Sequence, residues 1–223
     1  MKYPIGIQSF DQIIGDGYVY VDKTGLIYQL VKGGKIYFLS RPRRFGKSLL
    51  VSTLKCYFQG RKELFKGLAI DKLETEWAEY PVFHIDFNVG DFTLPGNLEA
   101  RIEETMAAWE KQYGRSDTAQ TTGARFIHVL HQARKRYGRR CVVLIDEYDK
   151  PILDVLDTGY ATTVDGERRL LEDRNREILK SFYSVFKTAD EDLQFVLLTG
   201  VTKFSQVSVF SGFNQPSDIS MDE

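Results

Sequence analysis

The chain has 223 residues, of which 43% are apolar and 13% aromatic. This composition is sufficient for a sizeable core and argues against wholesale disorder. The 30 basic residues nearly balance the 31 acidic ones, which argues against a protein that binds nucleic acid through a broad basic surface. No apolar run is long enough to span a membrane, and neither Cys56 nor Cys141 belongs to a Cys-x-x-Cys motif. Since no secretory leader follows Met1, we expect a cytoplasmic protein with reduced thiols.

Apolar runs of two kinds alternate along the chain. Short runs rich in β-branched and aromatic residues predict strands at 36–39, 81–87, 141–145 and 194–199. Longer runs with helical spacing predict helices at 48–58, 98–113, 124–137 and 167–188. The polar, glycine-containing segments 114–123 and 157–166 predict loops. Strands that alternate with helices predict an α/β fold, in which a mostly parallel sheet carries helices on both faces.

A Gly-Lys-Ser sequence lies between the first predicted strand and the first long helix. This strand–loop–helix arrangement is typical of a P-loop, the phosphate-binding (Walker A) loop of NTPases. Gly46 lets the backbone approach a phosphate, Lys47 supplies a cation for the β and γ oxygens, and the Ser48 hydroxyl can ligate Mg²⁺. The predicted nucleotide-binding residues are Arg43, Arg44, Phe45, Gly46, Lys47, Ser48 and Leu49.

The start of this loop departs from the usual pattern, because Arg41 stands where glycine is usual. Pro42 favours an extended conformation for Arg41, so the loop starts with a different geometry. Arg43 and Arg44 have two interpretations, either neutralising phosphate charge or forming a solvated basic turn. The alternative to a phosphate loop as a whole is an ordinary capped helix start.

Two adjacent acids end the strand predicted at 141–145, in the manner of the second (Walker B) half of an NTPase site. We expect Asp146 to hold the Mg²⁺ shell and Glu147 to orient or polarise the attacking water. The competing interpretation is helix capping, and we expect Asp149 to cap the helix near Pro151. Capping does not explain two neighbouring acids at the tip of a buried strand.

The last predicted strand ends in Thr199-Gly200-Val201-Thr202-Lys203. The carboxyl ends of parallel strands lie at one edge of a sheet, where ligands collect, so Thr199 or Thr202 could contact the γ-phosphate. The alternative is that these are simply turn residues. The predicted catalytic residues are therefore Lys47, Asp146, Glu147 and Thr199, with Ser48 and Asp146 as the Mg²⁺ ligands.

Four motifs in this order resemble the bacterial AAA-ATPase-like proteins, relatives of the AAA+ and STAND-type ATPases. They are Tyr20-Val21-Asp22-Lys23-Thr24, Arg41-Pro42-Arg43-Arg44-Phe45-Gly46-Lys47-Ser48, Leu144-Ile145-Asp146-Glu147-Tyr148-Asp149 and Leu198-Thr199-Gly200-Val201-Thr202-Lys203-Phe204-Ser205. The resemblance covers nearly the whole chain and accounts for an arginine at the start of the loop. It implies that the Thr199 strand lies between the phosphate-loop strand and the Asp146 strand. It also implies a further strand, a helical lid and commonly a C-terminal nuclease-like domain of the restriction-endonuclease type.

The chain ends soon after the fourth predicted strand, so we expect it to stop before the lid and the fifth strand. No lysine has Asp or Glu two residues before it, the spacing that a restriction-type nuclease site needs. We therefore expect residues 1–223 to be one nucleotide-binding domain, the N-terminal part of a longer protein. Within it, residues 21–24 either start a helix, with Asp22 as its cap, or form a lid over the nucleotide base.

The expected function is Mg²⁺-dependent ATP hydrolysis coupled to a conformational change, with ATP and Mg²⁺ as ligands. The alternative is a nucleotide-gated switch or interaction module with little or no hydrolysis, since none of the arginines stands out as one acting in trans. A third hypothesis is nucleic-acid binding through Arg134, Lys135, Arg136, Arg139 and Arg140, but such a cluster is usually a solvated helix end. The partners considered are a second copy of the chain and the nuclease-like domain of the longer protein, and no membrane.

Overall fold

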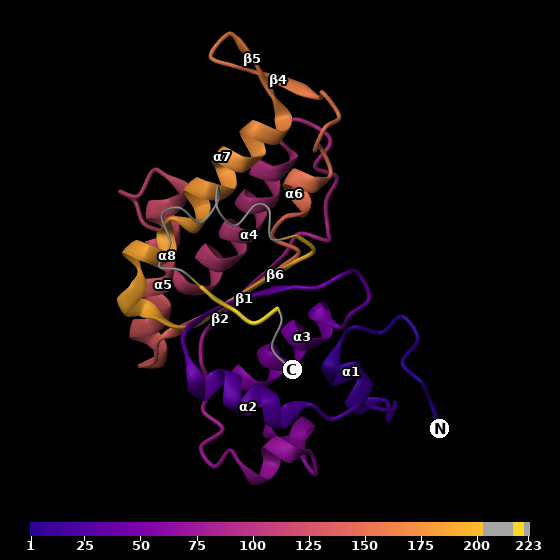
Figure 1. The fold of residues 1–223 in the computed structure, drawn as a ribbon. Helices are drawn as coiled ribbons and strands as arrows, with labels where there is room; N and C mark the ends of the chain where they lie inside the picture. The colour runs from indigo at the N-terminus through magenta and orange to yellow at the C-terminus, as the bar shows by residue number, and fades with distance from the viewer. Residues whose placement is uncertain (203–215, 221–223) are drawn as a thin grey trace.

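The computed structural model describes residues 1–202 and 216–220, which form a mostly parallel sheet with helices around it (Figure 1). Every pairing in the main sheet is parallel, and the strand order is β2-β3-β6-β1-β7. The strands are β1 (Ile36–Ser40), β2 (Val82–Asp86), β3 (Cys141–Asp146), β6 (Leu193–Gly200) and β7 (Ser217–Asp218). The α/β fold predicted from the alternating runs is confirmed. Lys203, Phe204 and Ser205 of the fourth motif lie outside the described residues.

The sheet order brings three predicted motifs to one edge. Strand β6 lies between β1 and β3, as the family resemblance implies. In the register, Leu39 of β1 is beside Thr199 of β6, and Ile145 of β3 is beside Leu198. Because all three strands run in the same direction, the phosphate loop, the acid pair and Thr199 leave the sheet at the same edge.

The sheet has a fifth strand, so the expectation that the chain stops before it is wrong. Strand β7 pairs in parallel with β1, and the amide of Ile219 donates to the Phe38 carbonyl at 3.0 Å. The Ser220 hydroxyl accepts a hydrogen bond from the Ser40 amide at 2.8 Å. A strand of two residues is too short to show the period-two pattern by which strands are recognised in a sequence.

Helices cover both faces of the sheet, each with its own core (Figure 1). Strand β3 is buried throughout and sends Val143 and Ile145 to one core, and Val142 and Leu144 to the other. This is the alternation expected of a central strand. One face carries α1 (Phe10–Gly15), α2 (Thr24–Gly33), α3 (Lys47–Phe58) and the 3₁₀ turns η1 (Lys62–Phe65) and η2 (Ala69–Lys72). The other carries α4 (Asn97–Tyr113), α5 (Thr122–Tyr137), α6 (Lys150–Leu153), α7 (Leu171–Tyr183) and α8 (Val185–Thr188), followed by the turn η3 (Asp190–Asp192).

A β-hairpin replaces part of two predicted elements. Strand β4 (Ala161–Val164) pairs antiparallel with β5 (Glu167–Leu170). The predicted loop is therefore wrong at 161–164, and the predicted helix is wrong at 167–170. Asp165 and Gly166 connect the strands with φ values of 52° and 83°. Positive φ at both central residues is characteristic of the type I′ turn that Asp-Gly favours. In Figure 1 the hairpin projects beyond the start of α7, away from the sheet.

The described part of the chain contains no helix both long and apolar enough to cross a membrane.

Candidate functional site

The loop between β1 and α3 has the backbone geometry of a tight turn at a helix start. Gly46 immediately precedes α3 with φ of 77°, in the left-handed region that glycine adopts without steric cost. Arg44 is also left-handed, with φ of 69°, a conformation that costs a non-glycine residue about 1–2 kcal/mol. The Arg41 amide donates to the Gly200 carbonyl at 3.1 Å, so the start of the loop continues the ladder between β1 and β6. An arginine fits there because its backbone, not its side chain, makes this bond.

Lys47 joins the loop to the acidic end of β3. It is the first residue of α3 and only 4% exposed. Its ammonium lies 3.1 Å from the Glu147 carboxylate and donates to the Arg41 carbonyl at 3.0 Å. The two motifs, a hundred residues apart in sequence, therefore meet at one place at the edge of the sheet.

The acid pair is held by Thr199 of the neighbouring strand. Asp146 ends β3 and is buried, and its carboxylate accepts a hydrogen bond from the Thr199 hydroxyl. Glu147 follows with φ of 52°, and its amide donates to the same hydroxyl at 3.4 Å. Burial raises the pKa of the Glu147 carboxyl above its usual range, and the Lys47 ammonium opposes this shift. Of the predicted catalytic residues, Lys47 therefore contacts Glu147, and Thr199 contacts Asp146.

Asp149 occupies the position before α6, but its side chain does not cap that helix, so the capping prediction is wrong. Its Oδ2 atom instead accepts hydrogen bonds from the amides of Val201 and Thr202, at 3.0 and 2.7 Å, and from the Thr202 hydroxyl at 2.9 Å. These bonds span more than fifty positions of sequence and pull the carboxylate toward β6. The contact of Thr202 with Asp149 differs from both roles expected for Thr202, a γ-phosphate contact or a turn.

The remaining loop residues lie at the surface. Arg43 and Arg44 are exposed and form no hydrogen bond or ion pair within residues 1–202 and 216–220, so both of their interpretations stand. Phe45 is 68% exposed. Ser48 and Leu49, in the first turn of α3, are partly exposed.

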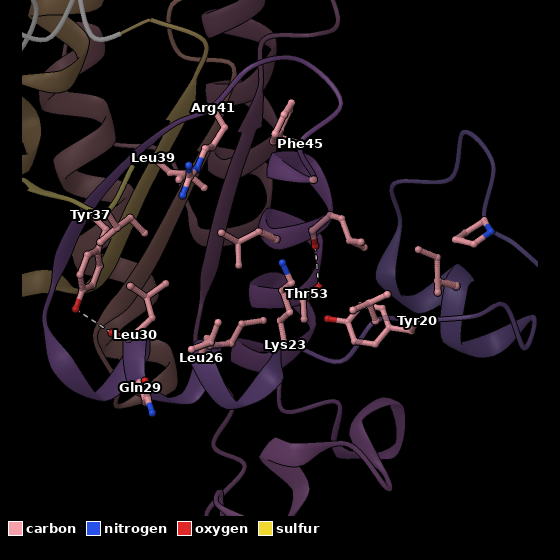
Figure 2. Close-up of a pocket in the computed structure, with 18 of the residues that line it drawn as sticks. Tyr20, Lys23, Leu26, Gln29, Leu30, Tyr37, Leu39, Arg41, Phe45 and Thr53 are labelled. Carbon is pink, nitrogen blue, oxygen red and sulfur yellow. Dashed lines mark hydrogen bonds between the residues drawn. The ribbon is translucent and has the colours of Figure 1, made fainter. Parts of the chain in front are cut away.

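A cavity of about 920 Å³ adjoins the loop, between the N-terminal segment, α2, β1 and α3 (Figure 2). In Figure 2, Lys23 and Leu26 lie on one side of this space, with Arg41 and Phe45 at its far end. Most of its lining side chains are apolar, and Gly46 also borders it. A cleft of this size and character is typical of a site for a small organic ligand.

The motif at 21–24 lines this cavity and also starts helix α2. Asp22 Oδ1 accepts hydrogen bonds from the amide and hydroxyl of Thr24, at 2.8 and 2.7 Å. Its Oδ2 accepts from the Ala69 amide at 2.7 Å. The N-cap of α2 is Lys23, so the prediction that Asp22 caps this helix is wrong, although the Asp22 carboxylate does bind the amide of Thr24 at the helix start. Val21 and Lys23 border the cavity.

The basic cluster at the end of α5 is largely engaged within the chain. Arg134 forms an ion pair with Asp192 at 3.0 Å, and Arg136 donates to the Gln112 carbonyl at 2.9 Å. The Arg139 guanidinium lies over the Tyr80 ring, 5.4 Å from its centroid. These contacts have structural roles, so they weaken the hypothesis that the cluster binds nucleic acid.

The predicted Mg²⁺ ligands Ser48 and Asp146 lie at the start of α3 and at the end of β3. No group of three or more His, Cys, Asp or Glu side chains that could hold a metal occurs among the described residues. Mg²⁺ needs no such cluster, because it usually takes one or two protein oxygens and completes its shell with water and substrate phosphate. The Asp146 carboxylate, whose Oδ1 accepts from Thr199, and the Ser48 hydroxyl are oxygen groups of the kind that Mg²⁺ prefers.

The parallel sheet and the Gly-Lys-Ser turn facing an acid pair define an α/β domain of the P-loop NTPase-like class. The chain belongs to the predicted AAA-ATPase family, whose model, described as "Predicted AAA-ATPase", matches residues 4–210. Membership of this family implies nucleotide binding, with ATP as the ligand.

The chain is also 45% identical over 223 residues to the "Uncharacterized protein in vnfD 5'region" of Azotobacter chroococcum mcd 1. The match covers 99% of this chain and 41% of that protein, so the chain spans about two fifths of its relative's length. The comparison with solved structures gave no significant match.

Proposed function

We propose that this domain binds ATP together with Mg²⁺ and hydrolyses the terminal phosphoanhydride. The observation that carries the proposal is the placement of the Lys47 ammonium, 3.1 Å from Glu147 and directly after the left-handed Gly46. Lys47 is a buried cation at a helix start, and the acid beside it directly follows a central strand that ends in Asp146. This arrangement suits a triphosphate and its metal.

The proposed roles follow from the chemistry of each group. The backbone of residues 43–49 binds phosphate oxygens, and Lys47 neutralises charge on the β and γ groups. Ser48 and Asp146 hold Mg²⁺, which supplies further charge neutralisation when bound. Glu147 orients the attacking water and accepts its proton, and Thr199 fixes the acids while facing the γ-phosphate.

The cavity beside the loop is the proposed place for the nucleoside. It opens next to Gly46, so a phosphate chain on the loop can continue into it. Its walls are mostly apolar, and the Gln29 amide and Lys23 ammonium are polar groups that could read the edge of a base. This proposal gives residues 21–24 part of the base-covering role considered from the sequence.

Binding of phosphate would also change the state of Glu147. In the structure the Lys47 ammonium is shared between Glu147 and carbonyls of the loop. A phosphate chain competes with the carboxylate for the same cation, so ATP would release Glu147 to act on water. This exchange provides a physical link between nucleotide binding and a conformational change.

Calorimetric titration with a non-hydrolysable ATP analogue, with and without Mg²⁺, tests the binding half of the proposal. Lys47→Ala should weaken binding by roughly ten- to a hundredfold, because a hydrogen bond to a charged group contributes about 1.5–3 kcal/mol. A steady-state assay with Glu147→Gln tests the hydrolytic half. Unchanged affinity in Lys47→Ala would show that the site assignment is wrong.

A nucleotide-gated switch with little hydrolysis is the second candidate, and the arginines favour it. Arg169 contacts Glu177 at 3.3 Å, Arg174 contacts Glu99 at 3.2 Å and Arg176 contacts Asp173 at 2.7 Å. These ion pairs join residues of the hairpin, α7 and α4, so none of these side chains serves the phosphate loop within the described chain. Wild-type turnover that is absent, or indifferent to Glu147→Gln, would favour the switch.

The remaining proposals concern the whole protein. Self-association would be one source of an arginine acting in trans, and a C-terminal nuclease-like domain would be a partner that nucleotide binding regulates. We also propose a cytoplasmic location.

A further inference from the structure

Two segments at the sheet edge are bonded into one unit: the acidic tip, residues 146–149, and the β6 end, residues 199–202. The Thr199 hydroxyl bonds to Asp146, and the Thr199 carbonyl accepts from the Tyr148 amide at 2.9 Å. The Tyr148 hydroxyl donates to the Thr202 carbonyl at 3.0 Å. Asp149 closes the arrangement through its three bonds to Val201 and Thr202.

Asp149 is held at a position that is costly for a carboxylate. Its exposed fraction is 0%, and burial raises its pKa, while the bonds from Thr202 and Val201 oppose that shift. Its Oδ1 atom has no hydrogen-bond partner among the described residues. Burying a charged group costs free energy unless hydrogen bonds compensate for the lost water. If Asp149 served stability alone, a well-packed apolar side chain could replace it.

The packing at Gly200 shows how closely the two segments approach. A Cβ atom at Gly200 would lie 2.7 Å from Asp149 Oδ1 and 2.6 Å from the Cδ1 atom of the Tyr148 ring. Neither contact is sterically possible without movement of the backbone or of a fully buried ring. The β6 end therefore lies against the acidic tip with no room for a side chain between them.

We propose that Asp149 is a positioning residue that clamps the β6 end to the acidic tip and so fixes both Asp146 and Glu147 for hydrolysis. The inference rests on the proposed function for its catalytic consequence. The connection runs through Thr199, whose hydroxyl donates to Asp146 and accepts from the Glu147 amide. A shift of the β6 end therefore displaces both acids together, and a misplacement of about 1 Å can cost roughly a hundredfold in rate.

The clamp predicts a separation of rate from binding. Asp149 is fully buried, does not line the cavity beside the phosphate loop and does not belong to that loop. Its loss should therefore disturb the acids more than the groups that hold the nucleotide.

The test measures ATP affinity, kcat and unfolding for Asp149→Ala, Asp149→Asn and Thr202→Val. We expect Asp149→Ala to lower kcat by about 10- to 100-fold while changing the Kd of an ATP analogue by less than about threefold. Asp149→Asn keeps an oxygen acceptor and should recover part of the rate, and Thr202→Val removes one of the donors and should lose less than Asp149→Ala. These milder variants decide the outcome if Asp149→Ala does not fold.

Asp192→Ala is the matched control. Asp192 is another buried acid and forms an ion pair with Arg134. It directly precedes the first residue of β6, so it lies about 20 Å or more along the strand from the β6 end that Asp149 binds. Its loss should lower the unfolding temperature without lowering kcat. If Asp149→Ala behaves like this control, with reduced stability and full kcat, the clamp is only structural and the proposal is overturned.

Hydrogen exchange separates failure of the clamp from failure of the proposed function. Asp149→Ala should speed amide exchange at Glu147 and Tyr148 as well as at Val201 and Thr202, whereas Asp192→Ala should not. If the wild type neither binds nor hydrolyses ATP, the proposed function fails, and exchange still decides whether Asp149 joins the segments. Faster exchange confined to residues 201 and 202 would refute the clamp in either case.

Discussion

The contact between Lys47 and Glu147 predicts that Glu147→Gln binds ATP more tightly than the wild type. The atoms lie 3.1 Å apart, and their side chains are only 3% and 13% exposed, so water screens this ion pair little. A phosphate chain must displace the carboxylate to take the ammonium. A charge-assisted contact is worth about 1.5–3 kcal/mol, so removing the competing charge should tighten binding by roughly ten- to a hundredfold.

The same substitution should reduce hydrolysis, because glutamine cannot accept a proton from water. Loss of a general base typically lowers the rate by about 10²–10⁴-fold. The variant should also be less stable without nucleotide, since a buried ammonium without its partner costs about 3–5 kcal/mol. Saturating ATP should restore that stability, because the phosphates then pair with Lys47.

The assay is calorimetric titration with a non-hydrolysable ATP analogue in Mg²⁺, paired with thermal unfolding. Glu74→Gln is the matched control, because Glu74 is a buried acid 3.1 Å from Lys32 in an ion pair outside the site. It should lower stability without changing the affinity for the analogue. If Glu147→Gln binds the analogue no more tightly than the wild type, the carboxylate does not compete with phosphate and the reasoning is refuted.

Three further predictions concern pH, packing and the cavity. Because burial raises the pKa of Glu147, the rate of hydrolysis should fall on acidification at a pH above the ordinary glutamate range. Lys47→Met removes the opposing cation, so any residual activity should fall at a still higher pH. A rate that falls only within the ordinary glutamate range would contradict this. Gly200→Ala should lower the free energy of unfolding, measured by denaturant titration, by about 1–3 kcal/mol. The control Gly25→Ala should not be destabilising, because a Cβ atom there would make only an ordinary 3.7 Å contact. Equal effects of the two substitutions would refute the tight packing at Gly200. Leu26→Trp, which fills part of the cavity, should weaken ATP binding at least tenfold but leave inorganic tripolyphosphate binding unchanged, and equal loss of both would place the base elsewhere.

The elements that position the site could be predicted because their signals are local. The all-apolar run of β3 indicated a central strand, and the residues that follow β1 and β3 indicated the edge at which the site forms. The order β3-β6-β1 followed from the family resemblance, since periodicity alone does not choose between strand orders. The hairpin was missed although Asp165-Gly166 carries a known turn signal, because β5 also fits the helical period that continues into α7.

The contacts within the site could not be predicted, because they join residues far apart in the sequence. Asp149 precedes a proline-containing helix, so local rules assigned it as a cap, whereas its carboxylate binds Val201 and Thr202. The ion pair of Lys47 and Glu147 likewise depends on the left-handed backbone of Glu147, which residue type alone does not favour.

The central place of β6 has a consequence for how the protein is made. Strands β1 and β3 leave the ribosome well before β6, yet each pairs with β6 and not with the other. Until residues 193–200 emerge, β1 lacks its neighbour on that side and the buried edge of β3 has nothing to pair with. The sheet must then close over about 150 residues of sequence, the kind of non-local pairing that makes folding slow and leaves strand edges open to aggregation. We expect nascent chains in which residues 193–200 have not yet emerged to need chaperones during synthesis.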